Sequence, residues 1–148
     1  MTHRQRVFLY ITQGDKLLVF DQVDFPEAGT QIPGGSIKPD EAPEAAARRE
    51  AYEETGLHSF SSQVLLAQEQ LDLTPYGRPE TLDAWFFHLS SNQETPRRWR
   101  HLESEPGDGA APIRFECYWV ALHPNLPLAG ADGRHLDKVT NQPSHDKS

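Results

Sequence analysis

The sequence has little positive charge. Its 14 lysine and arginine residues are outnumbered by 22 aspartate and glutamate residues, which gives a formal net charge of −8. Proteins that bind nucleic acid along its backbone carry a basic stripe, so this balance argues against bulk nucleic-acid binding. An anionic small molecule would therefore have to be attracted locally, by a bound cation and a few arginines.

Cysteine and long apolar runs are also scarce. Cys117 is the only cysteine, so no intramolecular disulfide can form, which fits the reducing cytoplasm. Because it lies in a strand-like run, we expect a buried and unreactive thiol. No apolar run is long enough to cross a bilayer, and the first residues do not resemble a signal peptide. We therefore expect a cytoplasmic protein without a membrane partner.

The chain length of 148 residues fits one domain. We expect this domain to span residues 1–140 and residues 141–148 to form a disordered tail. β-Branched and aromatic residues predict strands at 7–12, 16–20, 63–73, 81–89 and 115–122. The polar residues 90–109 predict a long loop, which in a compact domain is usually functional or mobile. A short C-terminal helix is expected within 124–139.

The most informative stretch is residues 34–57, GGSIKPDEAPEAAARREAYEETGL. Pro43 suits the first turn of a helix, where its missing N–H would be unpaired anyway. Residues 45–55 are rich in good helix formers, and Gly56 stands where a left-handed C-cap belongs. The stretch therefore predicts a helix that begins near Pro43 and ends before Gly56.

The predicted helix carries an acidic face. Glu50, Glu53 and Glu54 are spaced i, i+3 and i+4, so their carboxylates share one side. Like charges at this spacing repel, and a helix surface built only for stability would avoid them. Oxygen-only clusters suit a hard cation such as Mg²⁺ or Mn²⁺. Taken alone, however, the glutamates would also be compatible with a solvated acidic face.

The order of residues around these glutamates is more specific. From residue 35 the sequence reads G-x5-E-x7-R-E-A-x-E-E-x-G-L. This resembles the Nudix box, the signature of Nudix hydrolases, at every fixed polar and glycine position. At roughly 5–7% usage per residue type, such a match by chance is on the order of a few in a billion per starting position. The one departure is Ala51, which is smaller than the usual Ile, Leu or Val.

The resemblance implies a fold and a chemistry. Nudix domains are α/β/α sandwiches with a mixed β-sheet, and the box forms a loop, helix and loop beside that sheet. Nudix hydrolases cleave a nucleoside diphosphate linked to another moiety, using a divalent cation and an attacking water. The metal ligands implied here are three carboxylates and one backbone carbonyl, from Glu50, Glu53, Glu54 and Gly34. Arg49 completes the implied catalytic set by holding the glutamates in place, and Glu41 is expected to brace the loop.

The box does not fix the base that activates the water. The candidates are Glu50, Glu94, Glu103, Glu105 and His101. A histidine suits this role when its pKa lies near the operating pH.

The run from Arg97 to Arg100 surrounds an aromatic ring with cations, which would suit a site that binds phosphate and stacks a base. The predicted substrate-binding residues are Arg97, Arg98, Trp99 and His101. The alternative is a solvated loop whose Trp99 is anchored in the core.

Together these observations predict a Mg²⁺- or Mn²⁺-dependent pyrophosphohydrolase that acts as a monomer or homodimer. Its substrate would be a nucleoside triphosphate or a nucleoside diphosphate linked to another moiety. The alternative is a Nudix-fold module that binds a nucleotide or a partner without hydrolysis. The intact set of Glu50, Glu53 and Glu54 argues against that alternative, since such modules tend to lose these residues.

Overall fold

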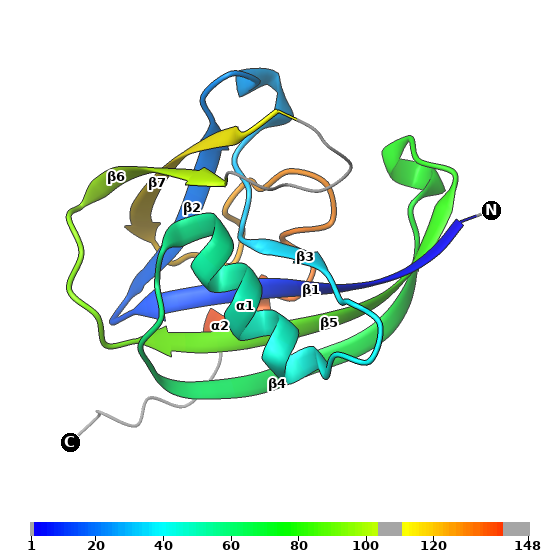
Figure 1. The fold of residues 1–148 in the computed structure, drawn as a ribbon, viewed down its shortest axis with the longest axis horizontal. Coiled ribbons are helices and arrows are strands. Elements are labelled where there is room, and N and C mark those ends of the chain that lie inside the picture. The colour runs from blue at the N-terminus through cyan, green and yellow to red at the C-terminus, as the bar shows by residue number, and fades with distance from the viewer. Residues whose placement is uncertain (1, 104–110, 141–148) are drawn as a thin grey trace.

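A seven-stranded mixed β-sheet forms the centre of the computed structural model, which describes residues 2–103 and 111–140 (Figure 1). Six strands follow the order β4-β5-β1-β2-β7-β6, and β3 lies beside β1. β1 and β5 are parallel, whereas the other strand pairs are antiparallel. The strands are β1 (Thr2–Gln13), β2 (Lys16–Gln22), β3 (Gly34–Ser36), β4 (Phe60–Asp72), β5 (Glu80–Ser91), β6 (Arg98–Glu103) and β7 (Ile113–Ala121).

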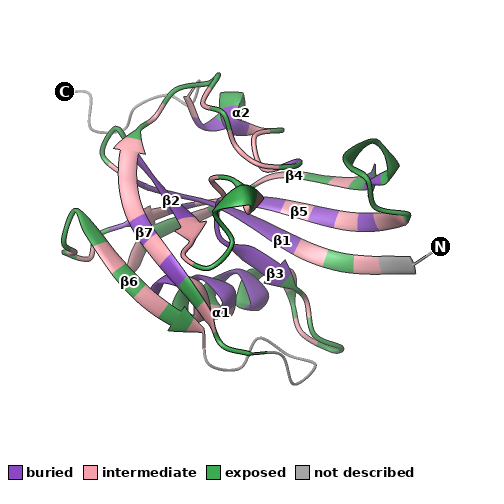
Figure 2. Cartoon of the chain, turned by 90° about the horizontal axis from the view of Figure 1, so that it is seen from above, coloured by how far each residue is buried: buried purple, intermediate pink, exposed green. Residues whose placement is uncertain are grey.

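Helices cover both faces of this sheet. Figure 2 shows α1 (Pro43–Thr55) on one side and the short α2 (Leu136–Thr140) on the other. β1 alternates between the two layers: Val7, Leu9 and Ile11 are buried with residues of α1, while Phe8 and Tyr10 are buried with residues of α2. This alternation is the period of a strand that is buried on both faces. The predicted α/β/α sandwich with a mixed sheet is confirmed.

β1 is the strand on which the rest of the sheet is arranged. It pairs with β5 along its length, with Thr12 opposite Ser90. Its other edge pairs first with β3, where Arg6 lies opposite Ser36, and then with β2 near the β1–β2 turn. The glycine pair that opens the Nudix-like stretch is thereby fixed directly beside β1.

The predicted strands and the helix that follows the glycine pair are present. The prediction of a loop at residues 90–109 is wrong for residues 90–91 and 98–103, and residues 104–109 lie outside the described part of the chain. β5 continues to Ser91, and β6 occupies Arg98–Glu103. β6 exposes Arg98, Arg100 and Leu102 and half-buries the residues between them. Because both of its faces are largely polar, its sequence lacks the apolar alternation that indicates a strand.

The remaining predictions concern the other elements, the cysteine, membrane spans and the tail. β3 was not predicted, and the helix expected within 124–139 is limited to α2 after a run of turns. Cys117 is buried as expected, and burial raises the pKa of its thiol to about 12. No helix in the described part of the chain is long and apolar enough to span a membrane. The expected tail, residues 141–148, lies outside the described residues.

The loop between β3 and α1 contains a strained position. Asp40 is exposed and has a φ of 64°, in the left-handed region that disfavours most side chains. Aspartate tolerates this region better than most residues, but glycine occupies it without steric cost. We expect Asp40→Gly to raise the free energy of unfolding by up to about 1 kcal/mol, and Asp40→Val to lower it by about 1–2 kcal/mol.

Chemical denaturation of both variants measures these changes. Asp15→Gly is the matched control, because Asp15 is an exposed turn residue outside the positive-φ positions, where glycine should only destabilise. A lower stability for Asp40→Gly than for the wild type would contradict the assignment of strain to this position.

Candidate active site

Helix α1 presents the carboxylates, and its boundaries follow from its sequence. It begins at Pro43 and ends before Gly56, whose φ of 83° places it in the left-handed region. The Gly56 N–H donates to the carbonyl of Tyr52 at 2.9 Å. Glu50 is 7% exposed, while Glu53 and Glu54 are partly exposed. The predicted shared face is thus a half-buried acidic surface.

Arg49 is hydrogen-bonded to three of the carboxylates around it. Its guanidinium donates to both carboxylate oxygens of Glu41, at 2.8 and 2.9 Å. It also donates to Glu50 at 3.0 Å and to Glu53 at 3.1 Å, and a further bond reaches the carbonyl of Ser36. The hydrogen bonds from Arg49 are the main reason why the pKa of Glu41 is lowered to about 2. The positive charge of Arg49 thereby offsets part of the repulsion among these carboxylates.

The glycine pair leaves room for the acidic side chains. A Cβ atom at Gly35 would collide with the carboxylate of Glu50, and one at Gly34 would collide with the carbonyl oxygen of Val7. The Gly34 N–H donates to Oε1 of Glu54 at 2.8 Å. Both glycines are therefore required by close packing, since any larger residue would displace either the strand or a glutamate.

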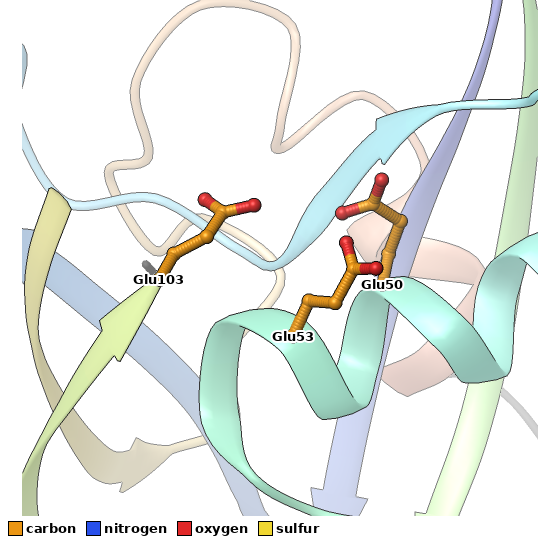
Figure 3. A group of neighbouring side chains, drawn as sticks. All are labelled: Glu50, Glu53 and Glu103. Carbon is orange, nitrogen blue, oxygen red and sulfur yellow. The ribbon is translucent and has the colours of Figure 1, made fainter. Parts of the chain in front are cut away.

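A fourth glutamate joins the site from another element. Glu50 and Glu53 of α1 and Glu103 at the end of β6 each offer one carboxylate oxygen, and these oxygens lie within 4.8 Å of one another. Figure 3 shows the three side chains converging on one space between α1 and β6. Such an oxygen-only set fits a hard divalent cation. Glu54 lies outside this group and is instead hydrogen-bonded to Gly34.

The electrostatics of the cluster are those of crowded, buried acids. Burial raises the pKa of Glu50 to about 7, opposed by Arg49 and reinforced by the charge of Glu53. Glu54 is partly exposed as a residue, but its carboxylate is buried, which raises its pKa well above the ordinary value, and the charge of Glu50 adds to this rise. The pKa of Glu103 is raised by burial and by the charge of Glu53. A bound cation would favour the ionised form of all these groups.

Side chains from the sheet bind the C-terminal end of α1. The ring Nε2 of His101 lies 2.9 Å from the carbonyl oxygen of Glu53, which only accepts, so this nitrogen carries the proton. Trp99 donates its indole N–H to the carbonyl of Thr55 at 3.0 Å. The thiol of Cys117 donates weakly to the carbonyl of Glu54 at 3.8 Å. Carbonyls that a helix end leaves unpaired are thus bound by β6 and β7.

The four predicted substrate-binding residues are not gathered in one place. Arg98 is paired with Glu116 and lies over the ring of Tyr118, while Arg97 is exposed. Trp99 and His101 face α1 through the bonds just described. Trp99 also packs against the core, as the alternative interpretation expected. Their part in substrate binding stays a prediction.

The structure also distinguishes the candidate bases. Glu103 lies in the carboxylate cluster, whereas Glu94 is exposed in the connection between β5 and β6. His101 is close to the cluster, but its Nε2 is engaged by the backbone of α1. Glu105 lies outside the described residues.

A cavity of about 170 Å³ lies on the α2 side of the sheet, where several of its lining residues belong to the core cluster that contains α2. Arg6, Phe8, Gln31, Arg78 and Asp132 are among the residues that line it. Burial raises the pKa of Asp132 to about 6, although the N–H of Ile32 donates to its Oδ2 at 2.9 Å. The sequence analysis did not identify this cavity, because its residues are scattered along the chain without a motif.

A family model described as the NUDIX domain matches residues 2–136. No curated protein matches the sequence.

Solved structures resemble the fold over almost the whole chain. A MutT protein from Bacillus halodurans has a TM-score of 0.67 at 17% identity, with 94% of this chain and 83% of that chain covered. A MutT NUDIX hydrolase from Burkholderia pseudomallei has a TM-score of 0.62 at 24% identity, covering 94% and 99%. The pyrophosphohydrolase BsRppH of Bacillus subtilis has a TM-score of 0.57 at 18% identity, covering 95% and 85%. At these identities the likeness shows the fold.

The raised pKa of Glu50 predicts how stability depends on pH when no cation is present. Between the ordinary pKa of 4.5 and the folded value of about 7, the unfolded chain releases a proton that the folded chain keeps. Stability is therefore lost as the pH rises through this window, and the full cost is present above about pH 7. At about 1.4 kcal/mol per pKa unit, the upper limit is on the order of 3 kcal/mol.

Denaturation in chelator at pH 5 and pH 8 measures this effect. Glu50→Gln cannot ionise, so its stability should fall less than that of the wild type between the two pH values. Glu44→Gln, an exposed glutamate of the same helix, should follow the wild type. If Glu50→Gln and the wild type lost the same free energy of unfolding between pH 5 and pH 8, ionisation of Glu50 would not be the cause of the loss.

Proposed function

The chain belongs to the NUDIX family, and on that ground we propose that it hydrolyses a diphosphate bond in a nucleotide-type substrate. The substrate class is a nucleoside triphosphate, or a nucleoside diphosphate linked to another moiety. The required cation is Mg²⁺ or Mn²⁺. The observation that carries this proposal is the convergence of Glu103 with Glu50 and Glu53 on one small space.

Carboxylates from two elements would hold the cation. Glu50 and Glu53 come from α1, and Glu103 comes from β6. Glu54 and the carbonyl of Gly34 are further proposed ligands on the strength of the Nudix-box resemblance. When bound, the cation would neutralise the diphosphate oxygens and so allow water to approach phosphorus. An acidic protein with a net charge of −8 needs such local compensation to bind a polyanion.

The remaining residues would position these carboxylates. Arg49 donates to Glu50 and Glu53 at once and is itself held by both oxygens of Glu41. This arrangement restricts the side-chain rotamers and lowers the entropic cost of ordering the site. Among the base candidates that the structure describes between residues 90 and 103, Glu103 is the one that lies with the α1 glutamates, so it would either bind the cation or activate the water.

The proposal extends to the organisation of the protein. Residues 1–140 would act as one catalytic domain, as a monomer or homodimer in the cytoplasm. Support comes from the single sheet, whose two core clusters draw on residues from β1 to α2. The substrate would be a small molecule, since the acidic composition disfavours the backbone of long nucleic acids.

A panel of nucleotides with Mg²⁺ or Mn²⁺ tests the activity. Both phosphate and pyrophosphate release are read, because the two products report which bond is cleaved. We expect turnover of at least one nucleoside triphosphate or nucleoside-diphosphate derivative, and none in chelator. Binding without turnover across the panel would contradict the proposal and favour a non-catalytic Nudix-fold module.

Substitution of the proposed ligands tests the site. Glu53→Gln and Glu103→Gln keep the side-chain shape but remove a charge that faces the cation. We expect each to lower kcat by about a hundredfold or more, with an unchanged fold by circular dichroism. Glu44→Gln on the same helix is the control and should keep wild-type turnover. If Glu103→Gln also kept wild-type turnover, β6 would have no part in the site.

A further inference from the structure

Arg6 stands out among the arginines that the structure describes. Three of them, Arg4, Arg6 and Arg49, are half-buried. Arg4 is ion-paired with Glu80, and Arg49 is ion-paired with its neighbouring glutamates. Within residues 2–103 and 111–140, the side chain of Arg6 makes no hydrogen bond or ion pair, and its guanidinium lies over the ring of Phe8, 5.3 Å from the ring centroid. Stacking orients this cation but leaves its five donors unused.

The cavity beside Arg6 contains an acid that does not neutralise it. Arg6 and Asp132 both line the cavity but are not ion-paired. Asp132 accepts the Ile32 N–H through Oδ2. Its other carboxylate oxygen makes no hydrogen bond within the described part of the chain. The cavity therefore offers a cationic donor and an acidic acceptor that a single ligand can bind separately.

Arg6 also lies beside β3, the strand whose Gly34 N–H binds Glu54. On β1 it is opposite Ser36 of that strand. Its positive charge acts on the carboxylates of both Glu54 and Asp132, so it is within electrostatic reach of each.

We propose that Arg6 is a substrate-binding residue that donates to an oxygen of the diphosphate, while the non-reacting part of the substrate occupies the cavity. This inference rests on the proposed function and assigns to Arg6 the contact with the diphosphate next to the cavity. A guanidinium is less strongly hydrated than an ammonium and matches the geometry of phosphate oxygens. In a protein of net charge −8, an unpaired arginine at this place supplies the local attraction that a polyanion needs.

Two substitutions at Arg6 test the inference. Arg6→Met removes the charge but keeps an unbranched side chain over Phe8, and Arg6→Lys keeps the charge without the planar fork. For the best substrate of the panel, Arg6→Met should raise KM by about tenfold or more, and Arg6→Lys should recover part of the loss. Lys16→Met, at the exposed first residue of β2, removes one charge elsewhere and controls for net charge.

Calorimetry gives a reading that does not depend on turnover. Methylenediphosphonate, which is not hydrolysed, is titrated in the presence of Mg²⁺, and Mn²⁺ is titrated alone. Arg6→Met should lose affinity for methylenediphosphonate by about tenfold or more and keep the affinity for Mn²⁺. A residue that only stabilised the carboxylates would instead change Mn²⁺ affinity and Tm without raising KM.

The outcomes separate this inference from the proposed function. If the wild type turns over no substrate but binds methylenediphosphonate through Arg6, the proposed function fails and the phosphate contact stands. If turnover is normal and Arg6→Met changes neither KM nor the affinity for methylenediphosphonate, the inference is overturned. It is also overturned if the wild type neither binds methylenediphosphonate nor turns over any substrate.

Discussion

Repulsion among half-buried carboxylates is the constraint on which the rest of this structure depends. Glu50 and Glu53 of α1 and Glu103 of β6 converge on one space, and burial raises the pKa of both Glu50 and Glu103. Without a compensating positive charge, burial and mutual repulsion would favour protonation of these carboxylates or would push them apart. The fold opposes this through Arg49, and a divalent cation would complete the compensation. The carboxylate cluster therefore destabilises the metal-free fold, and the same cluster is what would bind a metal ion.

The position of α1 relative to the sheet decides whether the cluster forms. The carbonyls of Glu53 and Thr55 are bound by side chains of β6, from His101 and Trp99. The same strand ends at Glu103, so the contacts that fix the helix end also fix the distance between the two halves of the cluster. On the other side of α1, the absence of a Cβ atom at Gly35 allows β3 to approach the carboxylate of Glu50.

Local signals in the sequence were sufficient for the helix and its acidic face. Pro43 and Gly56 mark the two ends of α1, and the spacing of the glutamates determines which of them share a side. β6 was missed because it alternates two arginines and a leucine with tryptophan, histidine and glutamate, so neither face is uniformly apolar. Its inner residues are polar since they bind helix carbonyls and face the carboxylates, which is a tertiary reason that no local pattern reveals. Arg6 and Asp132 line one cavity although 126 positions separate them in the sequence.

The central claim is that glutamates from α1 and β6 together hold one divalent cation, and anomalous scattering from a crystal containing Mn²⁺ tests it most directly. The account predicts a Mn²⁺ peak about 2.1 Å from carboxylate oxygens of Glu50, Glu53 and Glu103. A crystal with no Mn²⁺ peak between α1 and β6, or with Mn²⁺ bound there without Glu103, would contradict it.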